Sequence, residues 1–189
     1  MTKRCFIALN LPQQAKWELE SLIADLEKIN RDKNIKFVNP RQLHITLHFL
    51  GDLDEEQIDR VKEILSANVG NFQPIEIITG QISGFPDLKQ PNTIYLDCRE
   101  VSANQLGKMH AAVGQALKAI GLAVDERKRQ NHITLARIKG SCRFTAAEVE
   151  LSELSIGFDQ VDLMESVIVD PVTRKYKIIE SYKLERSQA

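Results

Sequence analysis

The stretch His44-Ile45-Thr46-Leu47 is repeated as His132-Ile133-Thr134-Leu135, and the two copies lie 88 residues apart in a chain of 189 residues. That spacing is close to half of the chain, which indicates an internal duplication. Isoleucine and threonine are β-branched and favour extended backbone. Each copy therefore predicts a strand, and the pair predicts one such strand in each half of the molecule.

The elements before each tetrapeptide repeat in the same order. Short buried strands are expected at residues 5–9 and 93–98, and each leads into an amphipathic helix. The helices are expected at 12–29, with Asn30 as the stop, and at 102–121, where a Ser-x-x-Gln capping box opens the helix and a glycine ends it. The apolar stripe of the first helix consists of Trp17, Leu19, Leu22, Ile23 and Leu26.

The elements around and after each tetrapeptide repeat as well. Short extended pieces are expected directly before the two copies, at 35–38 and 122–124. Capping-box patterns then open a further helix in each half, one at Asp54 and one at Thr145. Each half ends in extended sequence, and the second half adds a final strand; these segments are 75–82, 156–169 and 176–184.

These patterns predict an α+β fold in one domain over residues 1–189. The domain is expected to consist of two lobes, formed by β-α-β-β-α-β repeats at about 4–85 and 93–184. Mainly antiparallel sheets would face a central cleft, with the helices outside. A pseudo-twofold arrangement of the lobes would bring the two tetrapeptides to opposite walls of that cleft.

The repeated His-x-Thr pattern suits phosphoryl transfer without a metal. Side chains alternate along a strand, so His44 and Thr46 share one face, as do His132 and Thr134. One imidazole can then take a proton from water while the other gives a proton to the departing ribose oxygen. Histidine suits both roles because its unperturbed pKa is about 6.5. The threonine hydroxyls can bond the non-bridging phosphate oxygens.

The other histidines receive structural interpretations. His44 and His48 are spaced i, i+4 like the ligands of a zinc-binding helix, but the glutamate of that motif is absent and a strand is expected, so no metal is predicted. His48 is expected on the His44 face beyond Thr46, in a peripheral position, and its counterpart in the second half is Ala136. His110 lies within an amphipathic helix and is interpreted as structural.

Composition narrows the class of protein. With 43% hydrophobic and 27% charged residues, the sequence is typical of a globular domain. A net charge of −1 argues against a protein that coats long duplex nucleic acid. The sequence has neither an apolar run of about 20 residues nor a secretory signal at its start, so a cytoplasmic protein without membrane contact is expected. A monomer is also expected. Three cysteines follow no disulfide or zinc spacing and are expected to be buried free thiols: Cys5, Cys98 and Cys142.

Two His-x-Thr motifs on duplicated lobes resemble the 2H phosphoesterase superfamily. Within it, the chain is similar to the RNA 2′,3′-cyclic phosphodiesterases, also called 2′-5′ RNA ligases. The resemblance extends over essentially the whole chain. Asn131 stands where this family commonly has proline, and Tyr95 stands where a tryptophan is common. The segments that carry the resemblance are 4–12, 43–51, 84–86, 131–137 and 164–177.

The resemblance implies hydrolysis of RNA 2′,3′-cyclic phosphate ends to 2′-phosphomonoesters, with no metal or cofactor. It makes His44 and His132 catalytic and makes Thr46, Thr134 and Arg137 substrate-binding. Strict alternation would place Arg137 on the face opposite His132, so a twist, a bulge or the strand end must redirect it. As a hypothesis, His132 is the general base and His44 the general acid, and the near-symmetry leaves the reverse open. Run backwards, the same geometry would give weak 2′-5′ RNA ligation.

Two other functions stay open at this point. One is a cyclic phosphodiesterase that acts on a small cyclic nucleotide or an ADP-ribose cyclic phosphate, which the near-neutral charge permits. The other is a non-catalytic module that binds RNA ends, although binding alone does not require two imidazoles. For all three candidate functions, the expected partners are RNA ends or small cyclic nucleotides.

Overall fold

The computed structural model describes residues 1–189 except 102–103, 126–129, 147–148, 150–151, 169–173 and 186–189. Within the described residues there are nine strands, three α-helices and two short 3-10 helices. The strands are β1 (Lys3–Asn10), β2 (Ile35–Phe37), β3 (His44–Leu53), β4 (Ile75–Phe85), β5 (Thr93–Glu100), β6 (His132–Ile138), β7 (Ser155–Phe158), β8 (Gln160–Ile168) and β9 (Arg174–Lys183). The helices are α1 (Gln13–Ile29), α2 (Glu55–Asn68), α3 (Gln105–Ala119), η1 (Pro40–Gln42) and η2 (Val69–Asn71).

The strands form two antiparallel sheets. The first has the order β3-β1-β8-β9 and the second has the order β2-β6-β5-β4-β7. The strand pairs within both sheets are antiparallel. The α+β class and the antiparallel sheets expected from the sequence are therefore confirmed.

Each sheet contains strands from both halves of the sequence, which differs from the expected lobes. The first sheet joins β1 and β3 of the first half to β8 and β9 of the second. The second sheet joins β2 and β4 of the first half to β5, β6 and β7. The repeats at about 4–85 and 93–184 therefore exchange their last strands, and neither repeat forms a lobe by itself.

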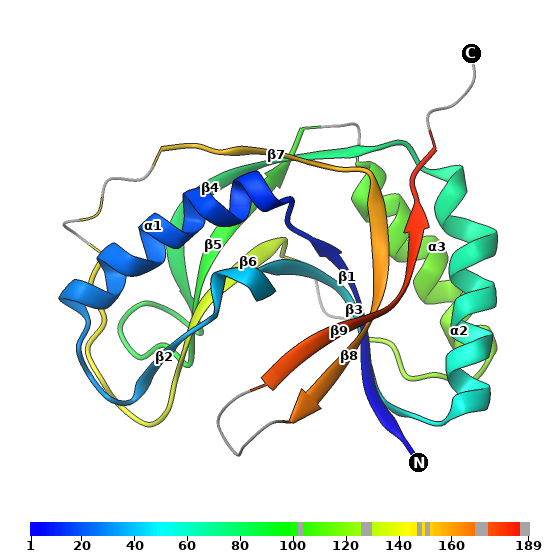
Figure 1. Cartoon of the computed structure of the whole chain (residues 1–189), viewed down its shortest axis with the longest axis horizontal. Helices are drawn as coiled ribbons and strands as arrows, with labels where there is room; N and C mark the ends of the chain where they lie inside the picture. The colour runs from blue at the N-terminus through cyan, green and yellow to red at the C-terminus, as the bar shows by residue number, and fades with distance from the viewer. Residues whose placement is uncertain (102–103, 126–129, 147–148, 150–151, 169–173, 186–189) are drawn as a thin grey trace.

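The helices cover the sheets from opposite ends of the molecule. Figure 1 shows α1 over the sheet that contains β4, β5 and β6. Helices α2 and α3 contact each other beyond the other sheet, and α3 also contacts β3. Most core residues form one large hydrophobic cluster shared by both sheets, and Phe6, Ala8 and Met164 form a second, small one. This arrangement leaves the line where β3 meets β6 as the junction between the two sheets.

Helix α1 matches its expected range but not its expected stripe. It ends at Ile29 with Asn30 as the C-cap residue. Trp17 is 60% exposed, whereas the buried positions are Ala15, Leu19, Leu22, Ile23 and Leu26. Residues two positions apart do not share a helix face, so a stripe that contains 15 and 19 excludes 17.

The later helices and extended pieces agree with the expectations only in part. The capping box at Asp54 is present, with reciprocal bonds between Asp54 and Gln57. The expected start of α3 at 102 lies outside the described residues, and the described helix begins at Gln105. The extended piece at 35–38 forms β2 over 35–37, but 122–124 belongs to no strand.

The helix expected to open at Thr145 is not found in the described residues of that region. Residues 142–146 and 149 are not helical, and Glu148 lies outside the described residues. Instead the side-chain amide of Asn30 donates to the Thr145 carbonyl at 2.8 Å and accepts from the Thr145 N–H at 2.9 Å. These two bonds hold Thr145 against the end of α1, where the backbone does not start a helix.

Candidate active site

The two His-x-Thr motifs occupy equivalent places at the junction of the sheets. His44 is the first residue of β3, and His132 is the first residue of β6. Over their first seven residues the two strands have the same sequence of half-buried, buried and exposed positions. Both histidines and both threonines, Thr46 and Thr134, are half-buried on one face of their strands, and the intervening isoleucine and leucine are buried. The alternation expected from the sequence is therefore confirmed for these four residues.

A β-bulge follows each motif at the same position. In the first sheet Ala8 pairs with Thr46 and Ile7 with His48, which leaves Leu47 as the extra residue. In the second sheet the register shift between Tyr95 and Ile94 leaves Leu135 as the extra residue. A bulge of one residue reverses which face the following side chains occupy.

The bulge in β6 turns Arg137 to the exposed face that His132 and Thr134 share. Arg137 is exposed while its neighbours Ala136 and Ile138 are buried. Strict alternation would have placed Arg137 on the face opposite His132, and the bulge places it on the same face. The equivalent position in β3 is Phe49, which is 62% exposed.

The bulge in β3 turns His48 into the core, so the expected place of His48 on the His44 face is wrong. His48 is 3% exposed, and its Nε2 lies 3.0 Å from the carbonyl oxygen of His110. The two rings stack with centroids 4.1 Å apart. His44 and His48 therefore lie on opposite sides of β3 and do not form a joint metal site.

The same backbone contact orients both candidate catalytic rings. Nδ1 of His44 lies 2.7 Å from the carbonyl oxygen of Gln42, and Nδ1 of His132 lies 2.9 Å from that of Gln130. A carbonyl only accepts hydrogen bonds, so Nδ1 carries the proton in each ring. In the neutral imidazole the lone pair is therefore on Nε2, which is the atom that accepts a proton when the ring acts as a base.

Aromatic side chains support each ring. His44 packs against Phe6 and Tyr176, both with centroid separations of 5.1 Å. His132 packs against Phe85 at 5.3 Å and Tyr95 at 5.4 Å. The two supports are built from different strands, β1 and β9 for His44 and β4 and β5 for His132. Packing and the carbonyl bond together fix the direction of each Nε2.

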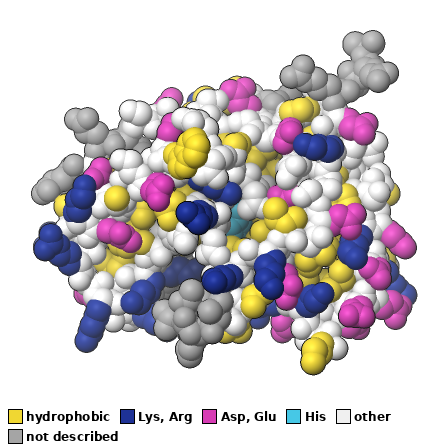
Figure 2. Space-filling model, in the orientation of Figure 1, with side chains coloured by type: hydrophobic (Ala, Val, Ile, Leu, Met, Phe, Trp, Pro, Cys, Tyr) yellow, Lys and Arg dark blue, Asp and Glu magenta, His cyan; other side chains and the backbone are white. Residues whose placement is uncertain are grey.

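Charged groups of the second motif and its strand lower the pKa of His44. Burial lowers the pKa of His44 to about 4, against the opposing effect of the Gln42 hydrogen bond. The positive charges of Arg137, His132 and Lys16 lower this pKa further. Three cationic groups, two from β6 and one from α1, therefore converge on the His44 ring. Figure 2 shows histidine surface near the middle of this face, with Lys and Arg side chains beside it.

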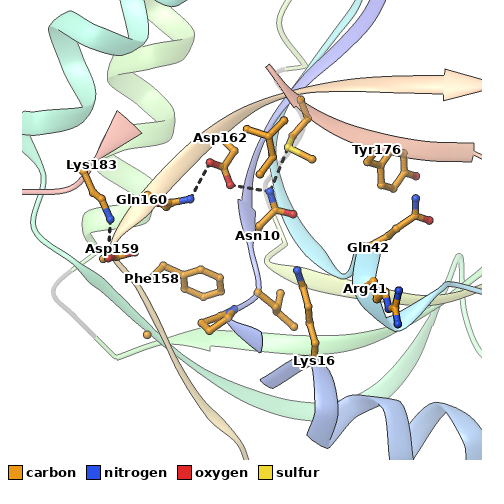
Figure 3. Close-up of a pocket in the computed structure, with 15 residues that line it drawn as sticks. Asn10, Lys16, Arg41, Gln42, Phe158, Asp159, Gln160, Asp162, Tyr176 and Lys183 are labelled. Carbon is orange, nitrogen blue, oxygen red and sulfur yellow. Dashed lines mark hydrogen bonds and ion pairs between the residues drawn. The ribbon is translucent and has the colours of Figure 1, made fainter. Parts of the chain in front are cut away.

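A cavity of about 470 Å³ opens beside His44. Gln42 and Tyr176, which both contact the His44 ring, line it together with Lys16 (Figure 3). Asn10 and the fully buried Asp162 form its polar side. Sequence reasoning assigned none of these residues to a site. Asn10 could have been found, because alternation along β1 places it on the face of Phe6 and Ala8, next to His44 in the ladder.

Other site types receive no support among the described residues. No group of three or more His, Cys, Asp or Glu side chains there is placed to hold a metal ion. None of the helices that the structure describes has the length and apolar character to cross a bilayer. The three cysteines are free, with Cys5 and Cys98 buried and Cys142 half-buried. Burial raises the pKa of Cys5 to about 11 and that of Cys98 to about 12, so both thiols stay protonated near neutral pH.

Comparison with known proteins gives one consistent family. The model of the family described as LigT like Phosphoesterase matches residues 9–95. An RNA 2′,3′-cyclic phosphodiesterase of Methanocaldococcus jannaschii is 32% identical over 136 residues, which cover 72% of each chain. A protein of the same name from Methanothermobacter thermautotrophicus is 26% identical over 190 residues, which cover 97% of this chain and all of the relative.

Solved structures show the same fold at lower sequence identity. TT0787 of Thermus thermophilus has a TM-score of 0.81 and 21% identity, with 97% of this chain and 99% of that chain covered. Escherichia coli LigT, solved in complex with 3′-AMP, has a TM-score of 0.78 and 17% identity, with 98% and 100% covered. The two sheets and their strand exchange therefore belong to a known architecture.

Proposed function

Because this chain belongs to the family of LigT-like phosphoesterases, we propose that it hydrolyses 2′,3′-cyclic phosphate ends of RNA to 2′-phosphomonoesters without a metal. The observation that carries the proposal is the matched pair of rings, His44 and His132, each oriented through Nδ1 by the same backbone contact at the start of its strand. The names of the curated relatives support the substrate class. The whole chain, residues 1–189, acts as one catalytic domain.

The reaction needs one proton removed and one proton delivered. One imidazole takes a proton from the attacking water as its oxygen forms a bond to phosphorus. The bond from phosphorus to the 3′ oxygen breaks, and the other imidazole gives its proton to that oxygen. Thr46 and Thr134 donate hydrogen bonds to the non-bridging oxygens, and Arg137 balances the charge that they gain in the transition state. The products are a 2′-phosphomonoester and a 3′-hydroxyl.

The surroundings of His44 favour an assignment of base and acid that is the reverse of the hypothesis from the sequence. A general base must be unprotonated before the reaction, and a pKa of about 4 keeps His44 neutral at pH 7 in the free protein. We therefore assign His44 as the base toward water and His132, in its protonated form, as the acid toward the 3′ oxygen. The reverse reaction would join a cyclic phosphate end to a 5′-hydroxyl end through a 2′-5′ linkage, and it would be weak against hydrolysis in water.

The activity is tested with nucleoside 2′,3′-cyclic phosphates and with oligonucleotides that end in one, in excess EDTA. We expect a 2′-phosphate product, with the isomers separated by chromatography. His44→Ala and His132→Ala should each lower kcat/KM by at least about a hundredfold, as removal of a general acid or base does. His110→Ala, the matched change at a histidine behind β3, should keep activity. Full activity in either of the first two variants would refute the mechanism.

The direction of proton transfer is tested with an activated phosphodiester, such as a 4-nitrophenyl ester, whose leaving group departs without protonation. Loss of the acid should then cost little, whereas loss of the base should cost as much as before. We expect His132→Ala to regain most of the lost rate on the activated ester relative to the cyclic phosphate, and His44→Ala to regain none. The opposite pattern would make His44 the acid.

The same assays separate the other functions. Turnover of small cyclic nucleotides or an ADP-ribose cyclic phosphate, with no turnover of oligonucleotide ends, would indicate a small-molecule phosphodiesterase. Tight binding of oligonucleotide ends without turnover would indicate a binding module. The convergence of three cationic groups on a half-buried imidazole favours catalysis, because a binding site for an anion gains nothing from keeping one of its rings neutral.

A further inference from the structure

The cavity beside His44 is not used by the histidine mechanism. The rings, the threonines and Arg137 account for the phosphate, but none of these side chains lines the cavity, which is lined by residues of α1, β8 and β9 among others. Its volume of about 470 Å³ falls within the range of about 300–1,000 Å³ that small-molecule sites occupy. A cyclic phosphate held at His44 carries a ribose directly attached to it, so the adjoining cavity is within reach of the nucleoside.

The polar side of the cavity has a fixed orientation. Asp162 is fully buried, and its carboxylate accepts hydrogen bonds from Asn10 Nδ2 at 2.7 Å, Ser181 Oγ at 2.5 Å and Gln160 Nε2 at 3.1 Å. A carboxylate that only accepts must face the amide nitrogen of Asn10, so Asn10 presents its Oδ1 away from Asp162. Figure 3 shows that oxygen turned away from Asp162. The cavity therefore offers an acceptor for a hydroxyl or amino group.

Lys16 supplies one of the positive charges of the cavity, which Arg41 and the Asp159-paired Lys183 also line. Its side chain comes from the first turns of α1 and extends toward Asn10 (Figure 3). Burial lowers the pKa of Lys16, while the charge of Asp162 raises it. A partly desolvated ammonium in a cavity that Tyr176 and Ile178 also line is suited to bind one phosphate group at a fixed place.

We propose that this cavity holds the nucleoside that carries the cyclic phosphate, with Asn10 accepting a hydrogen bond from it and Lys16 contacting the phosphate on its 5′ oxygen. This inference rests on the proposed function. Every RNA end longer than one nucleotide has that 5′ phosphate, whereas a free nucleoside 2′,3′-cyclic phosphate lacks it. Lys16 would therefore make the enzyme select RNA ends over free cyclic nucleotides.

The test compares adenosine 2′,3′-cyclic phosphate with the same molecule that bears a 5′ phosphate. The wild-type protein should prefer the second by about tenfold in kcat/KM, a ratio equivalent to about 1.4 kcal/mol. The preference should reside mainly in KM, because the 5′ phosphate does not change during the reaction. Lys16→Gln should abolish the preference. Lys28→Gln removes the same charge from the exposed end of the same helix, where Lys28 pairs with Asp25, and should keep it.

The outcomes separate this inference from the proposed function. If both substrates are hydrolysed equally well by the wild-type protein, or if Lys16→Gln keeps the full preference, the subsite assignment is wrong while the phosphodiesterase activity stands. Loss of the preference in Lys28→Gln as well would show that the overall field of the protein is responsible, and would overturn the role of Lys16. If neither substrate is hydrolysed, the proposed function fails and the subsite with it.

Discussion

The two candidate catalytic histidines differ in their surroundings, although their backbone contacts match. The carbonyls of Gln42 and Gln130 accept from Nδ1 in the same way. His44 is also surrounded by cations, because Lys16 and Arg137 add their charge to that of His132. Lys16 comes from α1, which covers the sheet that contains β6, the strand of His132.

The lowered pKa of His44 predicts how stability depends on pH. An unfolded chain with an imidazole pKa of about 6.5 binds a proton between pH 6.5 and 4, whereas folded His44 does not until about pH 4. The free energy of unfolding should therefore fall as the pH falls through this window. Between pH 7 and pH 5 the loss from His44 alone should be about 2 kcal/mol.

Urea unfolding of the wild-type protein and of His44→Gln at pH 7 and pH 5, at constant ionic strength, measures this contribution. The other titrating groups cancel in the comparison, so the variant should lose about 2 kcal/mol less than the wild type. Equal losses in the two proteins would mean that His44 titrates normally in the folded state.

At the scale of the elements, the paired bulges decide which side chains reach the junction of the sheets. Alternation, read from the sequence, correctly placed His44, Thr46, His132 and Thr134. It misplaced His48 because a bulge depends on the register with the neighbouring strand, which lies far away in the sequence. For the same reason, alternation in the sequence showed that Arg137 would have to change face to join His132, but it could not show that a bulge at Leu135 is the cause.

The equivalent positions after the two bulges carry different chemistry, which gives a matched pair of variants. Arg137 supplies a cation beside the histidines, whereas Phe49 supplies an exposed ring at the same place in β3. Arg137→Gln should lower kcat/KM on a 2′,3′-cyclic phosphate by roughly a hundredfold, the usual loss when one donor to a transition-state charge is removed. Phe49→Leu should change it by less than about threefold, within the ±0.5 kcal/mol of ordinary surface changes. Similar losses of kcat/KM in the two variants would show that the Arg137 guanidinium has no special role.

At the scale of the whole molecule, strand exchange makes the two halves interdependent. The order β3-β1-β8-β9 in one sheet corresponds to β6-β5-β4-β7 in the other. The first sheet is completed by β8 and β9 of the second half, and the second sheet takes in β4 of the first half. The repeat in the sequence revealed the duplication and most of its strands. It could not reveal the exchange, because a strand has the same local pattern whether it pairs within its own half or crosses to the other.

Division of the chain in the exposed loop between Leu88 and Lys89 tests this interdependence. The fragment 1–88 would contain β4 without its partners β5 and β7, and 89–189 would contain β8 without β1. Each fragment alone should therefore lack a cooperative unfolding transition. Their equimolar mixture should regain near-ultraviolet circular dichroism and hydrolysis of a 2′,3′-cyclic phosphate.

A mixture in which fragment 1–88 carries His44→Ala provides the control for this complementation. It should restore the folded spectrum without restoring turnover, because the His44 side chain takes part in proton transfer while the strands of its fragment still complete both sheets. Cooperative unfolding of either fragment by itself would mean that one repeat suffices to form a core. In that case the two repeats would fold as independent lobes, and the exchanged strands would not be needed for stability. The fold would then not depend on the crossing of β4 and β8 that brings the two histidines together.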